Sequence, residues 1–314
     1  MPIVLENVSV SDNNTGAART ATSNTGVART ATAGTGAANT GAASADTKLT
    51  LQNVSITVQD GEVFGIAGRT GSGKSTLASL IAGLLVPNEG SVQIFGNDTR
   101  NKKTHHAIRH SVAMVFQYPE RALFASTVRE DLSFGPRNLG VSANETEKRI
   151  QRALELLELP ESILNASPFA LSGGQQRRVA IAGVLAMQTK AIVLDEPMAG
   201  LDPAARKHLA SLIENLHEQG TTICVVSHDM DELACLCTHM AVLDEGHIAC
   251  SGTPLEVFSQ EETIIGRLGL ELPPSLELAQ ALRAHNVVLP YKIYTAESLA
   301  AAIAAAYKNR AHHT

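Results

Sequence analysis

The sequence predicts an α/β protein whose core is a mainly parallel sheet with helices on both faces. Apolar stretches of strand length alternate with stretches of helical spacing from residue 49 to about residue 250. This order is typical of parallel strands joined by crossover helices. The stretch "EVFGIAG" is apolar almost throughout rather than alternating, as expected for a strand buried on both faces.

The N-terminal part combines two predicted strands with a repetitive segment. A short strand is expected in "IVLENVSV", and residues 15–44 are then three near-copies of one decamer, beginning "TGAARTATSN". Because this composition offers too little apolar surface to order a chain, residues 12–47 are predicted to be a flexible insert. A small repeat domain is the alternative. Order resumes with the alternating strand "LTLQNVSITV", and Asp60-Gly61 marks the turn into "EVFGIAG".

The remaining elements follow from periodicity and from turn residues. Strands are expected in "SVQIFG", in a stretch ending at 114–116, in "AIVLDE", in "TTICVVSH" and in "HMAVLDEG". Helices are expected at 75–85, at about 145–159, at 203–220, at 229–237 and around 296–309.

Composition restricts the classes of function. The 314 residues, 44% apolar, suit one large or two modest domains. The net charge of −6, the lack of tryptophan and the 4% aromatic content argue against a nucleic-acid partner. The four cysteines are interpreted as free thiols of a reducing cytosol rather than a zinc site. No signal peptide is recognisable, and no apolar run approaches the roughly 20 residues of a spanning helix. If the protein works at a membrane, we expect it to dock onto a protein that spans it.

The segment "GRTGSGKS", Gly68 to Ser75, fits the pattern G-x-x-x-x-G-K-[ST] in full. It lies between a buried strand and a helix, which is the context that supports a phosphate-binding loop. Glycines allow the backbone to wrap phosphates, Lys74 can neutralise the β- and γ-phosphates, and the Ser75 hydroxyl can ligate Mg²⁺. The sequence therefore predicts a nucleoside triphosphate site.

Three further side chains follow expected strands. Asp195 and Glu196 end "AIVLDE", where one carboxylate can hold the Mg²⁺ shell and its neighbour can accept a proton from attacking water. His228 ends the next strand, at the edge where such sheets bind ligands, and can hydrogen-bond a γ-phosphate or the attacking water. Gln117 also follows a strand, and its amide can bind both Mg²⁺ and water.

A second anion-binding helix start is expected in "LSGGQQRRVA". The lysine loop already supplies one helix start for the chain's own nucleotide. Ser172, Gly173 and Gly174 are therefore expected to close the ATP held by a second subunit in a head-to-tail pair, so that ATP joins the two and hydrolysis releases them. The alternative is an ordinary helix capped by Ser172.

The ordered motifs "GRTGSGKS", "FQ", "LSGGQQRR", "VLDEP", "AGLDP" and "SHD" resemble the ATP-binding subunit of an ABC transporter. The resemblance implies a P-loop NTPase fold with an antiparallel β subdomain, a helical subdomain at about 118–175, an ATP-binding domain spanning 1–250 and a C-terminal extension at 251–314. It implies ATP and Mg²⁺ as cofactors, Glu196 as general base, and Ser75, Gln117 and Asp195 as magnesium ligands. The other nucleotide-binding residues that it implies are Gly68, Arg69, Thr70, Gly71, Ser72, Gly73, Lys74, Thr76, Ser172, Gly173, Gly174, Gln175 and Asp202, the last in a loop that touches the partner's site.

Longer stretches, including "MVFQYPERALFASTVREDLSFGPRNLGVS" and "DEPMAGLDPAARK", are similar to energy-coupling factor importers of vitamins and of cobalt or nickel ions. The similarity points to the second of their two ATPase types. It implies a second ATPase subunit, a transmembrane coupling subunit, a substrate-binding membrane subunit and a peripheral position on the cytoplasmic face of the membrane. Glu120, Leu123 and Phe124 would then contribute to a groove for the coupling subunit. Glu120 as a solvated loop acid is the alternative there.

One departure from the family concerns adenine. The first strand runs "NVSVSDNN" and lacks the aromatic residue against which adenine stacks in this family. We hypothesise that Val10 or a residue of the insert contacts adenine, and that selectivity between nucleotides is relaxed. Alternative functions are another ABC importer class, a soluble ABC ATPase acting on ribosomes or DNA, and a non-hydrolysing regulatory module.

Overall fold

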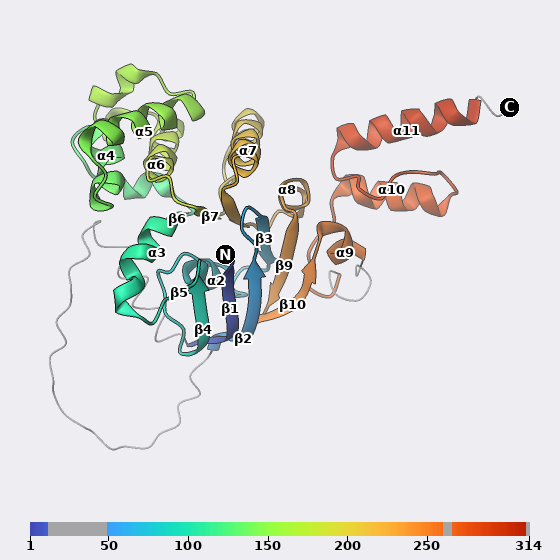
Figure 1. Ribbon diagram of the computed structural model, residues 1–314. Helices are drawn as coiled ribbons and strands as arrows, with labels where there is room; N and C mark the ends of the chain where they lie inside the picture. Colours follow the sequence, from blue (N-terminus) through green and yellow to red (C-terminus); the bar gives the residue numbers. More distant parts are fainter. Residues whose placement is uncertain (12–48, 260–265, 312–314) are drawn as a thin grey trace, which may run out of the picture. The chain divides into compact units, whose positions relative to one another are not determined.

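The computed structural model describes residues 1–11, 49–259 and 266–311 (Figure 1). The chain forms two compact units, each built from two separate segments: unit 1 is Met1–Thr57 with Ser79–Lys190, and unit 2 is Val58–Ala78 with Ala191–Thr314. The insert predicted at residues 12–47 lies outside the described residues.

Unit 1 contains a small sheet with the strand order β2-β1-β4-β5. Strand β1 pairs antiparallel with β4, and β4 with β5. Most apolar side chains of β1 and β4 are buried, while Glu6 and Gln93 are exposed, which is the pattern of a sheet with one covered face. The buried ones are Ile3, Leu5, Val8, Val10, Val92 and Ile94. The strands are β1 Ile3–Ser11, β2 Leu49–Val58, β4 Glu89–Ile94 and β5 Asn97–Asp98.

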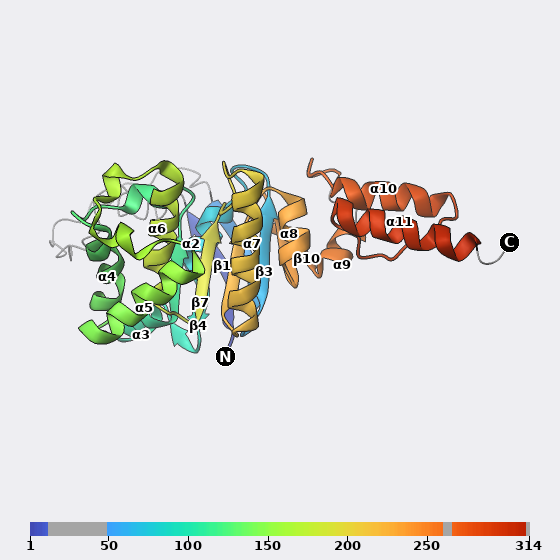
Figure 2. The same ribbon diagram turned by 90° about the horizontal axis from the view of Figure 1, so that it is seen from above.

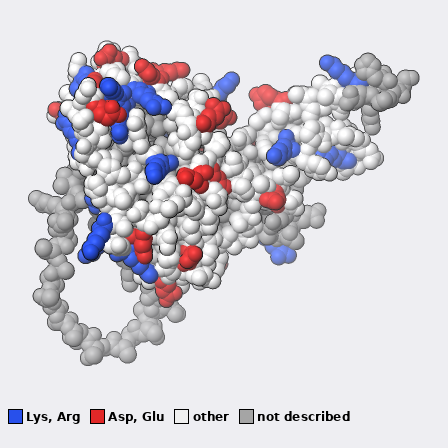
Figure 3. All heavy atoms as spheres, in the orientation of Figure 1, with Lys and Arg blue, Asp and Glu red and all other residues white. Residues whose placement is uncertain are grey.

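Unit 1 also contains a packed group of helices. Helix α4 packs on α5 and α6, and α5 packs on α6. Thr127 and Glu130 form a capping box at the start of α4, which satisfies its first backbone donors. The elements are η1 Lys102–Thr104, α3 His105–Ser111, β6 Val112–Val115, η2 Pro119–Ala122, α4 Val128–Asn138, α5 Ala143–Leu156, η3 Glu161–Asn165, η4 Pro168–Ala170 and α6 Gly173–Leu185. Figure 3 shows side chains of both charges intermixed over these helices.

Unit 2 contains the parallel sheet that the sequence predicts. Its strands run in the order β10-β9-β3-β8-β7. Strand β3 is parallel to β8 and β9, β7 is parallel to β8, and β10 is antiparallel to β9. Every residue of β3, β7 and β8 is buried. The strands are β3 Val63–Gly68, β7 Ala191–Asp195, β8 Thr222–Val226, β9 His239–Asp244 and β10 His247–Gly252.

Helices of unit 2 lie against this sheet and beyond it. Helix α7, Pro203–Glu218, contacts β8, and α8, Met230–Leu236, contacts β3. Helix α9, Pro254–Ser259, follows β10. Helices α10, Pro274–Ala284, and α11, Ala296–Ala311, lie side by side in both Figures 1 and 2. Their shared apolar core is Ala279, Leu289, Ile293 and Leu299.

The elements confirm the predicted fold class and add some that the sequence analysis missed. Strands β5 and β10 and helices α3, α4, α9 and α10 were not expected. Helix α2, Lys74–Ile81, begins in unit 2 and ends in unit 1. The described residues contain no helix with the length and apolar character needed to cross a membrane. Cys224, Cys235, Cys237 and Cys250 are free thiols.

Candidate nucleotide-hydrolysis site

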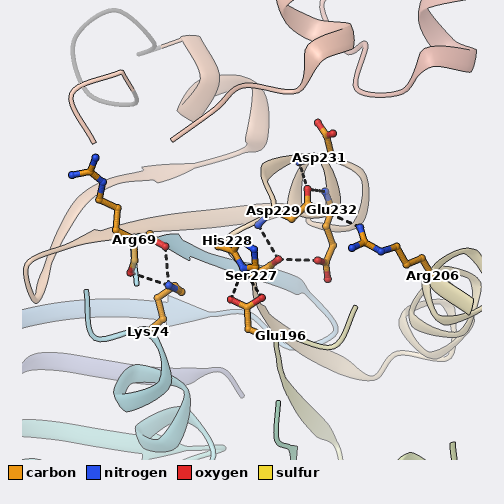
Figure 4. Close-up of polar contacts among 10 residues, drawn as sticks. Arg69, Lys74, Glu196, Arg206, Ser227, His228, Asp229, Asp231 and Glu232 are labelled. Carbon is orange, nitrogen blue, oxygen red and sulfur yellow. Dashed lines mark hydrogen bonds and ion pairs between the residues drawn. The ribbon is translucent and has the colours of Figure 1, made fainter. Parts of the chain in front are cut away.

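The loop between β3 and α2 is folded around the side chain of Lys74. The Lys74 ammonium donates to the carbonyl oxygens of Gly68 at 2.7 Å and Arg69 at 2.9 Å (Figure 4). The backbone N–H of Ser72 donates to the Arg69 carbonyl oxygen at 3.1 Å and closes a turn. Gly71 and Gly73 have φ angles of 86° and 104°, a region that favours glycine. The sequence therefore forms a compact loop with its lysine at the centre.

The interior of this loop has the properties of an anion cradle. A Cβ on Gly68 would collide with the carbonyl oxygen of Leu243 and lie 2.7 Å from the Ser72 hydroxyl, so the backbone at Gly68 leaves no room for a side chain. The Ser72 hydroxyl is buried and has no hydrogen-bond partner among the described residues. A buried hydroxyl without a partner is costly unless a ligand satisfies it. A Cβ at Gly71, by contrast, would meet only open space.

Charges of opposite sign lie close together at the loop. Burial lowers the pKa of Lys74, while the carboxylates of Glu196 and Asp195 raise it. Burial raises the pKa of Asp195, and the hydrogen bond from Ser75 opposes that change. Asp195 is the last residue of the fully buried strand β7 and is itself only 7% exposed. Its contact with the Ser75 hydroxyl pairs a carboxylate with a hydroxyl, the hard oxygen donors that Mg²⁺ prefers, so these residues fit such an ion.

Glu196 and His228 are joined directly. The Nδ1 of His228 lies 2.9 Å from Oε1 and 2.8 Å from Oε2 of Glu196. Glu196 has a φ of 50°, and its backbone N–H donates to the Val226 carbonyl oxygen at 2.9 Å. Non-glycine residues in this region are strained and cluster at functional sites. Because the Glu196 side chain is 12% exposed and that of His228 is 67% exposed, the imidazole covers a mostly buried carboxylate.

A second group of polar side chains surrounds the backbone of His228, and the sequence analysis missed it. The Ser227 hydroxyl donates to Oε2 of Glu232 at 2.8 Å and accepts from the backbone N–H of Asp229 at 3.0 Å. Asp229 forms an ion pair with Arg206 at 3.3 Å, and the Arg206 Nε donates to the Leu201 carbonyl oxygen. Figure 4 shows these side chains converging around Ser227.

A sequence signal for this group exists but predicts a different contact. Asp229 and Glu232 have the spacing of a capping box, in which the Glu232 side chain would accept the backbone N–H of Asp229. Asp229 does cap α8, accepting from Asp231 at 3.0 Å and Glu232 at 3.2 Å. The N–H of Asp229, however, donates to the Ser227 hydroxyl, and that hydroxyl in turn donates to the Glu232 carboxylate.

Other predicted residues of unit 2 lie at its surface. Thr70 is exposed and Thr76 is partly exposed. The guanidinium of Arg69 points away from Lys74 in Figure 4, and lies where a Cβ on Gly269 would collide with it. Asp202 caps helix α7, its Oδ1 accepting the backbone N–H of Ala205 at 2.9 Å. The structure thus brings together Lys74, Ser75, Asp195, Glu196 and His228, while Asp202 serves within the chain as a helix cap.

The remaining predicted residues belong to unit 1. Ser172 and Gln175 form a capping box on α6, with bonds of 3.3 Å and 3.1 Å. A Cβ at Gly173 or Gly174 would meet nothing within 4 Å, so the start of α6 is open. Gln117 is exposed in the loop after β6.

The hypothesis that Val10 contacts adenine does not hold. Val10 is fully buried in unit 1, and this leaves no surface of its side chain for a base. The other part of that hypothesis, a residue of the insert, lies outside the described residues.

The family model described as ABC transporter matches residues 51–199. The chain is 47% identical to the energy-coupling factor transporter ATP-binding protein EcfA2 of Latilactobacillus sakei, over 80% of this chain and 87% of that protein. It is 43% identical to EcfA2 of Symbiobacterium thermophilum, over 81% and 88%.

Two solved structures share the fold. The structure of cbiO1 from Clostridium perfringens, part of the ABC transporter complex cbiONQ, has a TM-score of 0.65 at 29% identity and covers 90% of this chain and 98% of its own. A dimeric ATP-binding cassette in a post-hydrolysis state, bound to ADP and Pi, has a TM-score of 0.64 at 27% identity and covers 80% and 98%. The family resemblance inferred from the motifs is confirmed: the chain belongs to the ATP-binding proteins of energy-coupling factor transporters, within the ABC transporter family.

Proposed function

We propose that this chain binds ATP with Mg²⁺ and, paired with a second ATPase subunit, hydrolyses it to drive the uptake of vitamins or transition-metal ions through an energy-coupling factor importer. The observation that carries the proposal is the contact of both Glu196 carboxylate oxygens with His228, in the same unit as the lysine loop. Relatives at 42–47% identity carry the name of such ATP-binding proteins, which supports this assignment.

The phosphate loop supplies nucleotide affinity. Lys74 exchanges its bonds to the Gly68 and Arg69 carbonyl oxygens for phosphate oxygens, and the partnerless Ser72 hydroxyl gains an acceptor. The backbone N–H groups around Gly71 and Gly73 and the start of α2 favour an anion there. Thr76, in the first turn of α2, lies at the same helix start.

Glu196 and His228 divide the work of hydrolysis. The Glu196 carboxylate accepts a proton from the attacking water. The His228 imidazole breaks its hydrogen bond with that carboxylate and forms one with the γ-phosphate or the water. Ser75 and Asp195 would hold Mg²⁺, which neutralises charge on the phosphates. A carboxylate held by a single imidazole becomes free to act once that imidazole turns toward another anion.

A second subunit completes each site. The open start of α6 at Ser172, Gly173 and Gly174 offers backbone N–H groups to the γ-phosphate held by the partner. Asp202 belongs to the loop that contacts the partner's site. ATP then favours the closed pair because its γ-phosphate interacts with both chains, and hydrolysis removes that interaction.

An aromatic pair in unit 1 supplies a docking surface for the transmembrane coupling subunit. Phe124 and Phe134 are 48% and 36% exposed and make an edge-to-face contact with ring centroids 4.9 Å apart. Both oxygens of Asp131 accept backbone N–H groups of this segment, from Phe124 at 3.3 Å and Ala125 at 3.1 Å, and this fixes the loop to α4. A rigid exposed aromatic pair is typical of a protein interface.

Glu120 gives this surface a charge. One of its carboxylate oxygens is buried without a hydrogen-bond partner among the described residues. Burial lowers the pKa of Arg177, and the charge of Glu120 opposes that lowering. An arginine of the coupling subunit would pair with the carboxylate of Glu120. Contact with that subunit holds the chain peripherally on the cytoplasmic face of the membrane.

Co-purification tests the importer assignment. The tagged chain, expressed from its own host and extracted in mild detergent, should bring with it a second ATPase and integral membrane proteins. Phe124→Ser should release the membrane proteins and leave ATP binding unchanged. Tyr307→Ser, at an exposed aromatic of α11, is the matched control and should retain them. Isolation without any membrane protein in every preparation would contradict the assignment.

A further inference from the structure

We propose that Glu232 is a positioning residue for hydrolysis: through the Ser227 hydroxyl, its carboxylate fixes the backbone of His228 and thereby the contact of His228 with Glu196. This inference rests on the proposed function, in which Glu196 and His228 carry the chemistry.

The backbone on both sides of His228 is held by one hydroxyl. The N–H of Ser227 donates to the Ile66 carbonyl oxygen at 3.1 Å, which ties the residue to strand β3. The Ser227 side chain is fully buried, and its hydroxyl accepts the N–H of Asp229 at 3.0 Å. His228 therefore lies between two residues that the same oxygen connects.

Glu232 determines which way that hydroxyl points. The hydroxyl carries a single proton, and its bond to Oε2 of Glu232 at 2.8 Å uses that proton. Its lone pairs are then directed at the N–H of Asp229. Without an acceptor at position 232 the hydroxyl proton could turn elsewhere, and the turn around His228 would lose its fixed geometry.

Burying the carboxyl group of Glu232 costs folding free energy, which argues that this group has a role. Its Oε1 is buried and has no hydrogen-bond partner among the described residues. The pKa of Glu232 is raised to about 7, chiefly by burial; the hydrogen bond from Ser227 and the charge of Arg206 oppose the rise, while the charges of Asp229 and Glu196 add to it. A neutral, isosteric side chain would avoid that cost.

The groups that face Glu232 come from several elements. Arg206 lies on α7, Glu196 follows β7, and Asp229 begins α8. The thiol of Cys237 at the end of α8 also interacts with it. Strand β3, on which α8 packs, contributes no titratable side chain. Arg206 is the single cation among these groups, so the ionised form of Glu232 faces mostly negative charge.

Ionisation should strengthen the hold on His228. A hydroxyl bonded to a carboxylate is held more firmly than one bonded to a neutral carboxyl group. As pH rises through 7, a growing share of molecules has Glu232 ionised, and the turn around His228 becomes better defined. We therefore expect the part of turnover that depends on Glu232 to increase over this range.

The test compares Glu232→Gln and Ser227→Ala with wild type in the assembled transporter, measuring kcat and KM for ATP from pH 6 to 8.5. Both variants should lower kcat roughly 5- to 50-fold at pH 8 and leave KM for ATP within about twofold, because neither touches the phosphate loop. The wild-type to Glu232→Gln ratio of kcat should fall toward pH 6. The double variant should be no slower than the single ones, since the two residues act as a unit.

Controls separate this inference from the proposed function. Glu218→Gln, at an exposed acid of α7, should behave as wild type throughout, and thermal unfolding establishes that each variant is folded. Suppose that Glu196→Gln and His228→Ala abolish turnover while Glu232→Gln and Ser227→Ala keep the wild-type rate and pH profile. The positioning role of Glu232 is then refuted and the proposed function still stands. If Glu196→Gln keeps full turnover, the proposed function fails as well. Additive losses in the double variant would also refute the link through Ser227.

Discussion

Both carboxylate oxygens of Glu196 lie within hydrogen-bond distance of the Nδ1 of His228, at 2.9 Å and 2.8 Å. A carboxylate bound in this way has limited freedom to accept a proton from water. The imidazole therefore covers the carboxylate that we propose as the general base.

The role of Glu196 predicts the behaviour of Glu196→Gln. The amide keeps the shape of the side chain but cannot take a proton from water, so phosphate release should fall about 100-fold or more. ATP binding should persist and the closed dimer should accumulate, because closure needs the γ-phosphate and opening needs its loss. Size-exclusion chromatography with ATP and phosphate assays measure the two effects. Unchanged phosphate release would exclude Glu196 as the base.

Lys74→Ala should weaken ATP binding itself. The ammonium provides charge-assisted bonds worth about 1.5–3 kcal/mol, equivalent to roughly 10- to 100-fold in Kd. Titration of a fluorescent ATP analogue measures the change. Lys207→Ala, at an exposed lysine of α7, serves as the control, and equal affinity in the two variants would rule out the loop as the nucleotide site.

The open start of α6 predicts that charge at Ser172 controls dimerisation. Aspartate is as good a helix cap as serine, so Ser172→Asp should leave the fold intact. Its negative charge would repel the partner's γ-phosphate, so the ATP-dependent dimer of the Glu196→Gln variant should be lost in Ser172→Asp/Glu196→Gln.

The control for this charge is Ser142→Asp, because Ser142 caps α5 in the same way, its hydroxyl accepting the N–H of Glu145 at 3.4 Å. Light scattering with and without ATP measures the dimer in the Ser172→Asp variant and in the Ser142→Asp control. A stable dimer in the Ser172→Asp double variant would contradict the shared-nucleotide arrangement.

Glu232 also predicts a dependence of stability on pH. A carboxyl whose pKa rises from its ordinary 4.5 to about 7 on folding favours the folded state while it is protonated. That contribution is present in full below 4.5 and is lost as pH rises to 7. Glu232→Gln cannot titrate and therefore does not lose this stability. The free energy of unfolding of the variant, relative to that of wild type, should increase between pH 5 and pH 8 by about 3 kcal/mol at most.

Urea denaturation at the two pH values measures this difference. Glu218→Gln should show no such trend. A constant gap between Glu232→Gln and wild type over this pH range would show that Glu232 does not titrate there in the folded protein.

The lack of an aromatic residue at the end of the first strand predicts weak discrimination between bases. With Val10 buried, that strand provides no ring for adenine to stack on. The Kd values for ATP and GTP should therefore differ by less than about tenfold, a difference of about 1.4 kcal/mol. Competition against a fluorescent nucleotide measures both values, and a strong preference for ATP would overturn the hypothesis.

The sequence predicted the lysine loop and placed Glu196 and His228 at strand ends because these features depend on short local patterns. Lys74 and Ser75 follow a buried strand, and Glu196 and His228 end two neighbouring ones, so parallel topology alone brings the last two to the same edge of the sheet. The hydrogen bond between them follows from that placement.

Other features depended on contacts that no local pattern encodes. Glu232 has capping-box spacing from Asp229, yet the Ser227 hydroxyl comes between them. Helix α4 escaped notice because it contains Gly135 and Pro136, residues with poor helix propensity. Val10 appeared available to a base because burial cannot be read from an alternating strand without knowing which face is covered.

The bonds from Lys74 to the Gly68 and Arg69 carbonyl oxygens have a consequence for affinity. These carbonyl oxygens solvate the Lys74 ammonium, so an incoming phosphate competes with the protein main chain rather than with water alone. Measured affinity is then the difference between two well-matched sets of acceptors. Because Lys74 regains these main-chain acceptors when nucleotide leaves, the free-energy cost of releasing ADP is reduced. This favours an ATPase that must exchange ADP for ATP in every cycle.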